Sequence, residues 1–183
     1  MSETVMEISI PLDEGEFFRR ECPLCNRQFK IHVSKEECQN LVQKEFENYL
    51  LQNSGLEIDD SQESDTHDTA EFWCPYCGQL AEVGKWWTRE QLEYIHIFGY
   101  NIAIKALNES FKDLKNQNSD NGFVSIKFEV NEMPYKKPWI SPEPDDMTRR
   151  DLPCCHLDLK LDDNYSGPFY CYQCGFLHSQ KNT

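Results

Sequence analysis

The sequence predicts an α+β fold in which small β-hairpin modules surround a helical element with one long amphipathic helix. Three observations predict it: C-x-x-C turns beside alternating apolar residues, two capping motifs that precede helical periodicity, and a proline-rich stretch near residue 140. The 183 residues are 39% hydrophobic and 13% aromatic, which suffices for one or two compact domains.

Charge and hydropathy narrow the class of protein. Lys and Arg number 18 against 32 Asp and Glu, and the formal net charge of -14 disfavours a general grip on nucleic-acid phosphates. Nothing approaches an apolar run of about 18 residues, and the start, MSETVMEISIPLDEG, has neither a basic nor an apolar signal region. We therefore expect a cytoplasmic protein in a reducing compartment, with no membrane span.

Nine cysteines dominate the chemistry, and their odd number prevents all of them from pairing as disulfides within the chain. Three C-x-x-C turns stand out: Cys22-Pro-Leu-Cys25, Cys74-Pro-Tyr-Cys77 and Cys171-Tyr-Gln-Cys174. Each turn can aim two sulfurs at one metal ion. The residues that follow the turns are suited to a positive φ: Asn26, Gly78 and Gly175.

The two C-P-x-C turns predict one metal site. Zinc prefers four N or S ligands in a closed structural site, and these turns supply four sulfurs. The predicted ligands of site 1 are Cys22, Cys25, Cys74 and Cys77. The ninth cysteine, Cys38, lies on an apolar helical stripe, which indicates a small buried hydrophobic residue rather than a nucleophile.

The third turn needs a partner arm, and none of the remaining sequence has a C-x-x-C pattern. The segment Asp151-Leu-Pro-Cys154-Cys155-His156 can supply two ligands, either both cysteines or one cysteine with His156 as the alternative ligand. We favour the two cysteines because thiolates fill the rest of the site; an incomplete site stays open as an alternative. Site 2 is therefore predicted as Cys154, Cys155, Cys171 and Cys174, giving two Zn²⁺ ions per chain.

These segments resemble zinc ribbons, the β-hairpin modules in which two cysteine knuckles clasp one zinc ion. The segments Phe18 to Phe29 and Phe72 to Gly78 resemble the two arms of one ribbon, and Phe169 to Gly175 resembles the closing arm of another. The resemblance covers about a third of the chain and implies metal binding far more specifically than any one function. The 48 residues between Cys25 and Cys74 exceed what a ribbon needs and imply an inserted element.

The region 1–132 is expected to form an N-terminal ribbon and helical domain. Alternation over residues 4–10 predicts a first strand, and Ser34-Lys-Glu-Glu37 is a capping box that opens a helical insertion over about 34–53. An acidic segment over about 54–71, without Lys or Arg, predicts a solvated loop.

A second capping box, Thr88-Arg-Glu-Gln91, opens the long helix over about 88–115, after a return strand expected over 82–87. Its apolar stripe covers more than half of the circumference, which predicts cover by the first helix, the C-terminal ribbon or another chain, including a second copy. Alternation predicts a further strand over 123–130.

Four prolines between Met133 and Asp146 predict an extended connector over 133–150, and a C-terminal zinc ribbon follows over 151–183. No pattern for catalysis accompanies these modules: H-E-x-x-H and phosphate-binding glycine loops are absent, and the predicted sites use four protein ligands. We therefore expect a non-catalytic adaptor or regulatory subunit that binds a protein partner through the long helix and aromatic side chains. A metalloenzyme would require an open or water-bearing zinc site.

The alternative is a nucleic-acid-binding accessory factor that uses the ribbons. It rests on a locally basic edge formed by Arg19, Arg20, Arg27, Lys30 and Lys35. Aromatic side chains near the knuckles are candidates for stacking on bases, for an interface, or for a supplement to a thin core. They are Trp73, Tyr76, Trp86, Trp87, Trp139, Tyr170 and Tyr172.

Overall fold

The sheet topology joins the two ends of the chain. The computed structural model describes residues 8–53, 71–117 and 132–179 and confirms the mixed α+β class. A four-stranded antiparallel sheet has the order β1-β2-β6-β5, with β1 at Phe17–Glu21, β2 at Gln28–His32, β5 at Met147–Leu152 and β6 at Leu157–Asp162. The strands that follow the proline-rich connector are therefore hydrogen-bonded to strands that precede it.

The two hairpins of this sheet are built alike. Arg19 pairs with Lys30 in β1–β2, and Arg149 pairs with Lys160 in β5–β6, 130 residues later; the rest of the register shifts by the same number. The two hairpins meet where Lys30 of β2 pairs with Lys160 of β6. The sheet thus has an internal two-fold relationship centred on these two lysines.

Two shorter hairpins repeat this relationship. β3 (Glu71–Trp73) pairs with β4 (Leu80–Glu82), and β7 (Phe169–Tyr170) pairs with β8 (Leu177–His178). Phe72 faces Ala81 in the first hairpin and Phe169 faces His178 in the second, so equivalent residues lie 97 positions apart. The described residues therefore contain two similar modules of two hairpins each, and one hairpin of each module contributes to the four-stranded sheet.

Both predicted helix starts are confirmed. α1 spans Lys35–Asn53, and in its capping box Glu37 N–H donates to Ser34 Oγ while Ser34 N–H donates to Glu37. α2 spans Arg89–Gln117, and Thr88 and Gln91 exchange the same two hydrogen bonds. Cys38, Val42 and Phe46 are buried, as the stripe predicts.

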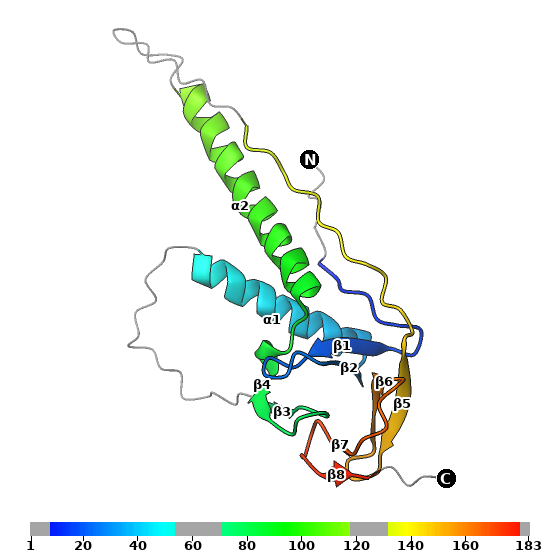
Figure 1. Ribbon diagram of the computed structural model, residues 1–183. Helices are drawn as coiled ribbons and strands as arrows, with labels where there is room; N and C mark the ends of the chain where they lie inside the picture. Colours follow the sequence, from blue (N-terminus) through cyan, green and yellow to red (C-terminus); the bar gives the residue numbers. More distant parts are fainter. Residues whose placement is uncertain (1–7, 54–70, 118–131, 180–183) are drawn as a thin grey trace, which may run out of the picture.

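The two helices cross each other, and α2 continues away from the sheets with an extended chain beside it (Figure 1). Ile95, Phe98 and Ile104 of α2 are buried, whereas between Lys105 and Lys112 only Asn108 is buried. Neither helix combines the length and the apolar composition that a bilayer span needs, a finding that covers the described residues.

Residues 132–146, which we call the strap, are the extended chain that runs along α2 (Figure 1). Asn101 exchanges two hydrogen bonds with the backbone of Lys136, at 2.6 and 2.9 Å. Two helical turns further along α2, Asn108 exchanges two hydrogen bonds with the backbone of Met133, at 3.1 and 3.0 Å. The strap has the extended conformation that its prolines predict, but it is held against the helix at both positions.

Four expectations from the sequence need correction or lie outside the described residues. Residues 8–10 form no strand, because the carbonyl oxygens of Ile8 and Ile10 face side chains of α1, Gln39 Nε2 and Cys38 Sγ, instead of a neighbouring strand. The return strand β4 ends at Glu82, and a 3-10 turn, η1 (Val83–Lys85), follows. The predicted strand over 123–130, and the acidic segment up to residue 70, lie outside the described residues.

β5 starts at Met147, within the stretch predicted as the connector over 133–150, and continues into the predicted C-terminal ribbon over 151–183. Pairing of β2 with β6 also places strands from both predicted domains in one sheet. The domain boundaries themselves stay a prediction.

Candidate metal centres

The three C-x-x-C turns share one backbone conformation, the knuckle. In each, the N–H of the residue after the second cysteine donates to the carbonyl of the first at 2.9 Å. That residue has a positive φ, 57° at Asn26, 67° at Gly78 and 71° at Gly175, as the sequence predicts. This conformation directs both sulfurs to the same side of the chain.

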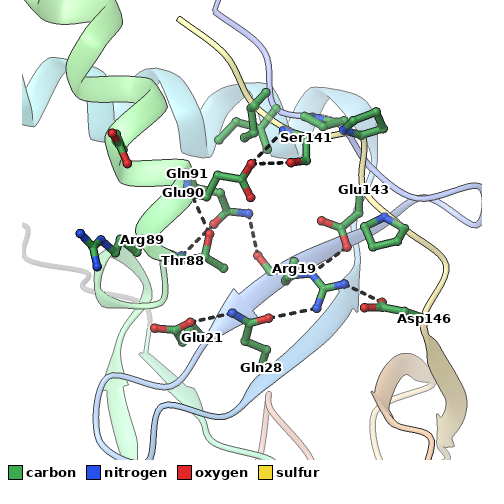
Figure 2. Close-up of a pocket in the computed structure, with 16 residues that line it drawn as sticks. Arg19, Glu21, Gln28, Thr88, Arg89, Glu90, Gln91, Ser141, Glu143 and Asp146 are labelled. Carbon is green, nitrogen blue, oxygen red and sulfur yellow. Dashed lines mark hydrogen bonds and ion pairs between the residues drawn. The ribbon is translucent and has the colours of Figure 1, made fainter.

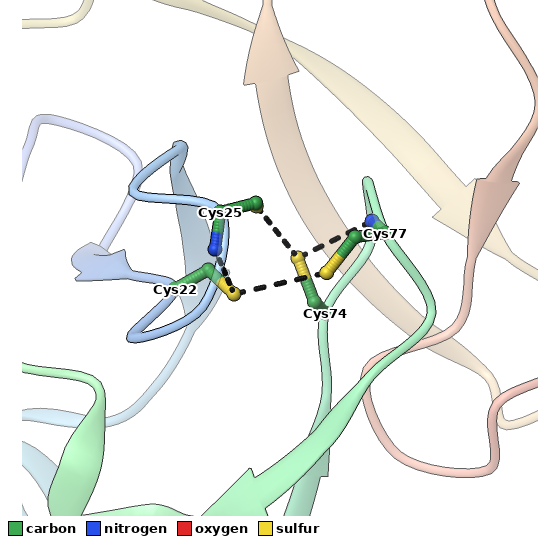
Figure 3. Close-up of side chains that lie close together, drawn as sticks. All are labelled: Cys22, Cys25, Cys74 and Cys77. Carbon is green, nitrogen blue, oxygen red and sulfur yellow. Dashed lines mark hydrogen bonds between the residues drawn. The ribbon is translucent and has the colours of Figure 1, made fainter.

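Site 1 brings together the four cysteines that the sequence assigns to it (Figure 3). All four sulfurs lie within 4.8 Å of one another; Cys22 and Cys77 are 3.9 Å apart and Cys25 and Cys74 are 3.7 Å apart. A tetrahedron with metal–sulfur bonds of about 2.3 Å has sulfur–sulfur edges of about 3.8 Å. The cluster therefore has the dimensions of a four-sulfur metal site.

Backbone N–H groups also point at these sulfurs. Leu24 and Cys25 donate to Cys22 Sγ at 3.4 Å, and Cys77 donates to Cys74 Sγ at 3.5 Å. Burial raises the pKa of the Cys22 thiol, but these N–H donors outweigh it and the net pKa is lowered. At Cys74 burial prevails and the pKa is raised, which a metal cation would reverse by displacing the proton.

Site 2 includes a fourth, related turn, in which one of the two cysteines lies at a different position than in the three C-x-x-C turns. The turn between β5 and β6 has its positive φ at His156, 54°, and Cys155 N–H donates to the carbonyl of Leu152. Leu152 therefore stands where Cys22 stands in site 1, and its side chain is fully buried. Cys154 supplies the missing sulfur from the position that Leu24 occupies in site 1.

The four sulfurs of site 2 also lie within 4.8 Å of one another: those of Cys154, Cys155, Cys171 and Cys174. Cys154 and Cys174 are 3.7 Å apart. His156, the alternative ligand, is exposed and does not belong to this group. Two cysteine groups on paired hairpins are consistent with zinc-ribbon-like modules, and both groups could bind metal.

The two sites differ in their access to solvent. Cys22 and Cys74 of site 1 are buried, whereas Cys154 and Cys174 of site 2 are exposed. The backbone N–H of Phe176 lowers the pKa of the Cys174 thiol to about 7, so this sulfur ionises readily near neutral pH. Site 2 is therefore the more accessible of the two for metal exchange.

One ligand-type side chain near site 2 was not singled out by the sequence. His178, on β8, has its Nε2 atom 3.2 Å from Cys154 Sγ. It lies in no spacing motif with Cys154, because the two residues come from different hairpins. The signal that could have found His178 is the alignment of the two modules, in which His178 corresponds to Ala81 of the site 1 hairpin.

The closing hairpins of the two sites lock together. Trp73 N–H donates to the carbonyl of Tyr172, and Tyr170 N–H donates to the carbonyl of Pro75, both at 2.9 Å. The rings of these two donors also lie over the knuckle glycines of the opposite site: a Cβ at Gly78 would lie 2.7 Å from the Tyr170 ring, and a Cβ at Gly175 would lie 2.8 Å from the Trp73 ring. The hairpins that carry the two cysteine groups are thus packed directly against each other.

Most of the aromatic side chains that the sequence analysis names are buried or hydrogen-bonded within the molecule. Trp86, Trp87 and Tyr172 are buried, and Tyr76 O–H donates to the carbonyl of Gln28. Trp139, on the strap, is 65% exposed. Among these aromatic residues it has the most surface for a partner.

The predicted basic edge is largely used within the molecule. Arg20 is fully buried, and its guanidinium faces the rings of Phe18 and Trp87. Arg27 lies over the rings of Tyr76 and Tyr165 at 3.7 and 4.6 Å. Of the five residues, only Lys35 lies at the start of a helix, α1, where it is exposed to solvent.

Arg19 and Lys30 are held by carboxylates of the strap. Figure 2 shows Arg19 donating to Glu143 at 2.8 Å and to Asp146 at 2.5 Å, at the edge of a cavity of about 570 Å³ between the strap, β1 and the start of α2. Lys30 contacts the same two carboxylates at 2.9 and 3.0 Å and also donates to the carbonyl of Pro144. These cations anchor the strap to the sheet.

No protein-family model, no curated protein and no solved structure matches this chain.

Proposed function

We propose that the chain binds two zinc ions, one at each cysteine group, and acts as a non-catalytic adaptor or regulatory subunit for a protein partner. The metal assignment rests on one observation: the structure contains two groups of four cysteine sulfurs, and the sulfur–sulfur distances in them match the edges of a tetrahedral metal site. Four soft thiolates in a tetrahedron are a donor set that favours zinc over Mg²⁺ or Ca²⁺.

The donor count also supports a structural role for the metal. A catalytic zinc ion keeps one position open for water or substrate, whereas four protein sulfurs fill the coordination sphere. The hairpins β3–β4 and β7–β8 have strands of two or three residues, which are too short to be stable alone. A metal at each knuckle pair would supply the missing free energy.

Metal content of the purified full-length protein tests this assignment. We expect two zinc ions per chain, falling to one in Cys74→Ala and in Cys171→Ala. Cys38→Ala is the matched control: this buried thiol lies outside both groups, burial raises its pKa to about 11, and its replacement should leave two zinc ions. Fewer than two zinc ions per wild-type chain, or a loss in the control equal to that in the variants, would refute the proposal.

We propose that the partner binds the outer part of α2 and the strap. Leu107, Tyr135 and Trp139 are 43%, 56% and 65% exposed. Large exposed apolar side chains on a chain with a net charge of -14 favour a protein over a polyanion. A groove of about 720 Å³ is lined by residues of α1, α2 and the strap, among them Tyr49, Tyr100 and Lys136.

Site-specific photo-crosslinking in the native host tests the partner. A crosslinking residue at Leu107 or Trp139 should capture the same protein, and one at Leu24, which is 61% exposed on a knuckle, should not. The nucleic-acid alternative has less support, because Arg19, Arg20 and Lys30 are buried or ion-paired. Binding of nucleic acid that weakens steeply with salt would restore it and overturn the adaptor proposal.

A further inference from the structure

The two modules place different residues beside their metal centres. In site 1, the residue of β4 that corresponds to His178 is Ala81, and the position that corresponds to Cys154 is Leu24, which is 61% exposed and supplies no ligand. Site 2 has an imidazole at the first of these positions and a sulfur at the second. Site 1 therefore has four sulfur donors, whereas site 2 has four sulfur donors and an imidazole nitrogen beside one of them.

The imidazole of His178 is held in place for this contact. Its ring stacks on Phe169 with ring centroids 5.3 Å apart and an interplanar angle of 18°, and it meets the edge of Phe176 at 5.0 Å. Phe169 is buried and pairs with His178 across the β7–β8 hairpin. With the ring fixed by two neighbours, little rotamer entropy is lost when Nε2 binds a metal.

We propose that His178 is a fifth donor of site 2: when Cys154 is not bound to the metal, Nε2 of His178 takes its place and keeps the site closed. The inference rests on the proposed occupation of site 2 by zinc. Zinc accepts imidazole nitrogen as readily as thiolate sulfur, and structural sites use either four cysteines or three cysteines with one histidine. In this exchange one zinc–sulfur bond breaks, one zinc–nitrogen bond forms, and the released thiolate takes a proton from water.

The exchange changes the charge of the site. Zinc with four thiolates carries about -2, and with three thiolates and a neutral imidazole it carries about -1. Cys154 is the sulfur expected to leave, because it is exposed and is the sulfur that His178 Nε2 contacts. Site 2 could therefore release one thiol to solvent without losing its metal, which site 1 cannot do.

Metal stoichiometry of four full-length variants tests the inference. Cys154→Ala should retain two zinc ions, His178→Phe should retain two, and the double variant should retain one. Cys22→Ala is the matched control at site 1, where Ala81 offers no replacement, and it should retain one. Phe at 178 keeps the ring stacking, so a loss of metal in the double variant is not a loss of packing.

Loading the same proteins with Co²⁺ identifies the ligands, because a four-sulfur set and a three-sulfur, one-nitrogen set have different visible absorption. Wild type should show two four-sulfur sites, and Cys154→Ala one site of each kind. A single zinc ion in Cys154→Ala, with the site 1 spectrum intact, overturns the inference and leaves the proposed function standing. Two zinc ions in the double variant also overturn it. Fewer than two in wild type refutes the proposed function itself.

Discussion

Lys30 and Lys160 face each other at the centre of the sheet, and both ammonium groups contact the same oxygen, Oδ2 of Asp13, at 3.2 and 2.8 Å. The other oxygen of Asp13 accepts from the N–H groups of Gly15 and Phe17. Two lysines paired across a strand repel each other, so this buried carboxylate is what permits β2 and β6 to join. This ionic contact on the local two-fold axis joins the two modules, together with the β2–β6 pairing and the hydrogen bonds between the closing hairpins.

Asp13→Asn should destabilise the protein by about 3 kcal/mol or more, because it leaves two buried ammonium groups with one compensating charge fewer. Urea unfolding of the zinc-loaded protein measures the change. Asp145→Asn is the control: Asp145 also binds Lys160, at 2.6 Å, but it is 52% exposed, and its loss should cost less than about 1 kcal/mol. Equal losses in the two variants would show that Asp13 has no special role at the sheet centre.

Gly78→Ala and Gly175→Ala should each destabilise the protein by about 1–3 kcal/mol, since both positions combine a positive φ with an aromatic ring where the Cβ would lie. Each change should also weaken zinc binding at both sites, because each glycine belongs to one site and its covering ring to the other. Gly84→Ala, with nothing within 4 Å of its Cβ, should stay within about 0.5 kcal/mol of wild type. Denaturant unfolding and zinc titration measure the two effects, and a weakening confined to one site would contradict the coupling.

A chelator should empty site 2 before site 1. The sulfurs of Cys154 and Cys174 are exposed, whereas Cys22 and Cys74 are buried. Timed alkylation followed by peptide mass analysis should find label on Cys154 and Cys174 while Cys22 and Cys74 are still protected. Simultaneous labelling of both groups would mean that the protein loses both metals in one unfolding step.

Asn101→Ala and Asn108→Ala should each release one point of the strap. Because Asn101 Oδ1 accepts from Lys136 N–H and Asn108 Oδ1 accepts from Met133 N–H, each variant should speed hydrogen exchange at its own amide. The expected loss of stability is about 1–2 kcal/mol, since a partly buried backbone N–H and a partly buried carbonyl lose their partner. Ser110→Ala, exposed on the same helix, is the control and should change neither amide. Unchanged exchange at Lys136 in Asn101→Ala would contradict the anchoring.

The sequence by itself determined the features that depend on local spacing. The three C-x-x-C knuckles, the positive φ at Asn26, Gly78 and Gly175, and the two capping boxes follow from residues within five positions of one another. The buried stripe of α1 follows from helical periodicity. Assigning the eight cysteines to two groups also required the general rule that a structural zinc ion takes four ligands.

The tertiary structure decided what depends on residues far apart in the chain. The pairing of β2 with β6, the strap along α2, the capture of Arg19 by Glu143 and the approach of His178 to Cys154 join segments with no common motif. Periodicity shows that a residue is apolar or charged at a given spacing, but it carries no information on which distant segment will cover it. The predicted basic edge illustrates the difference, because five cations close in sequence face different parts of the fold.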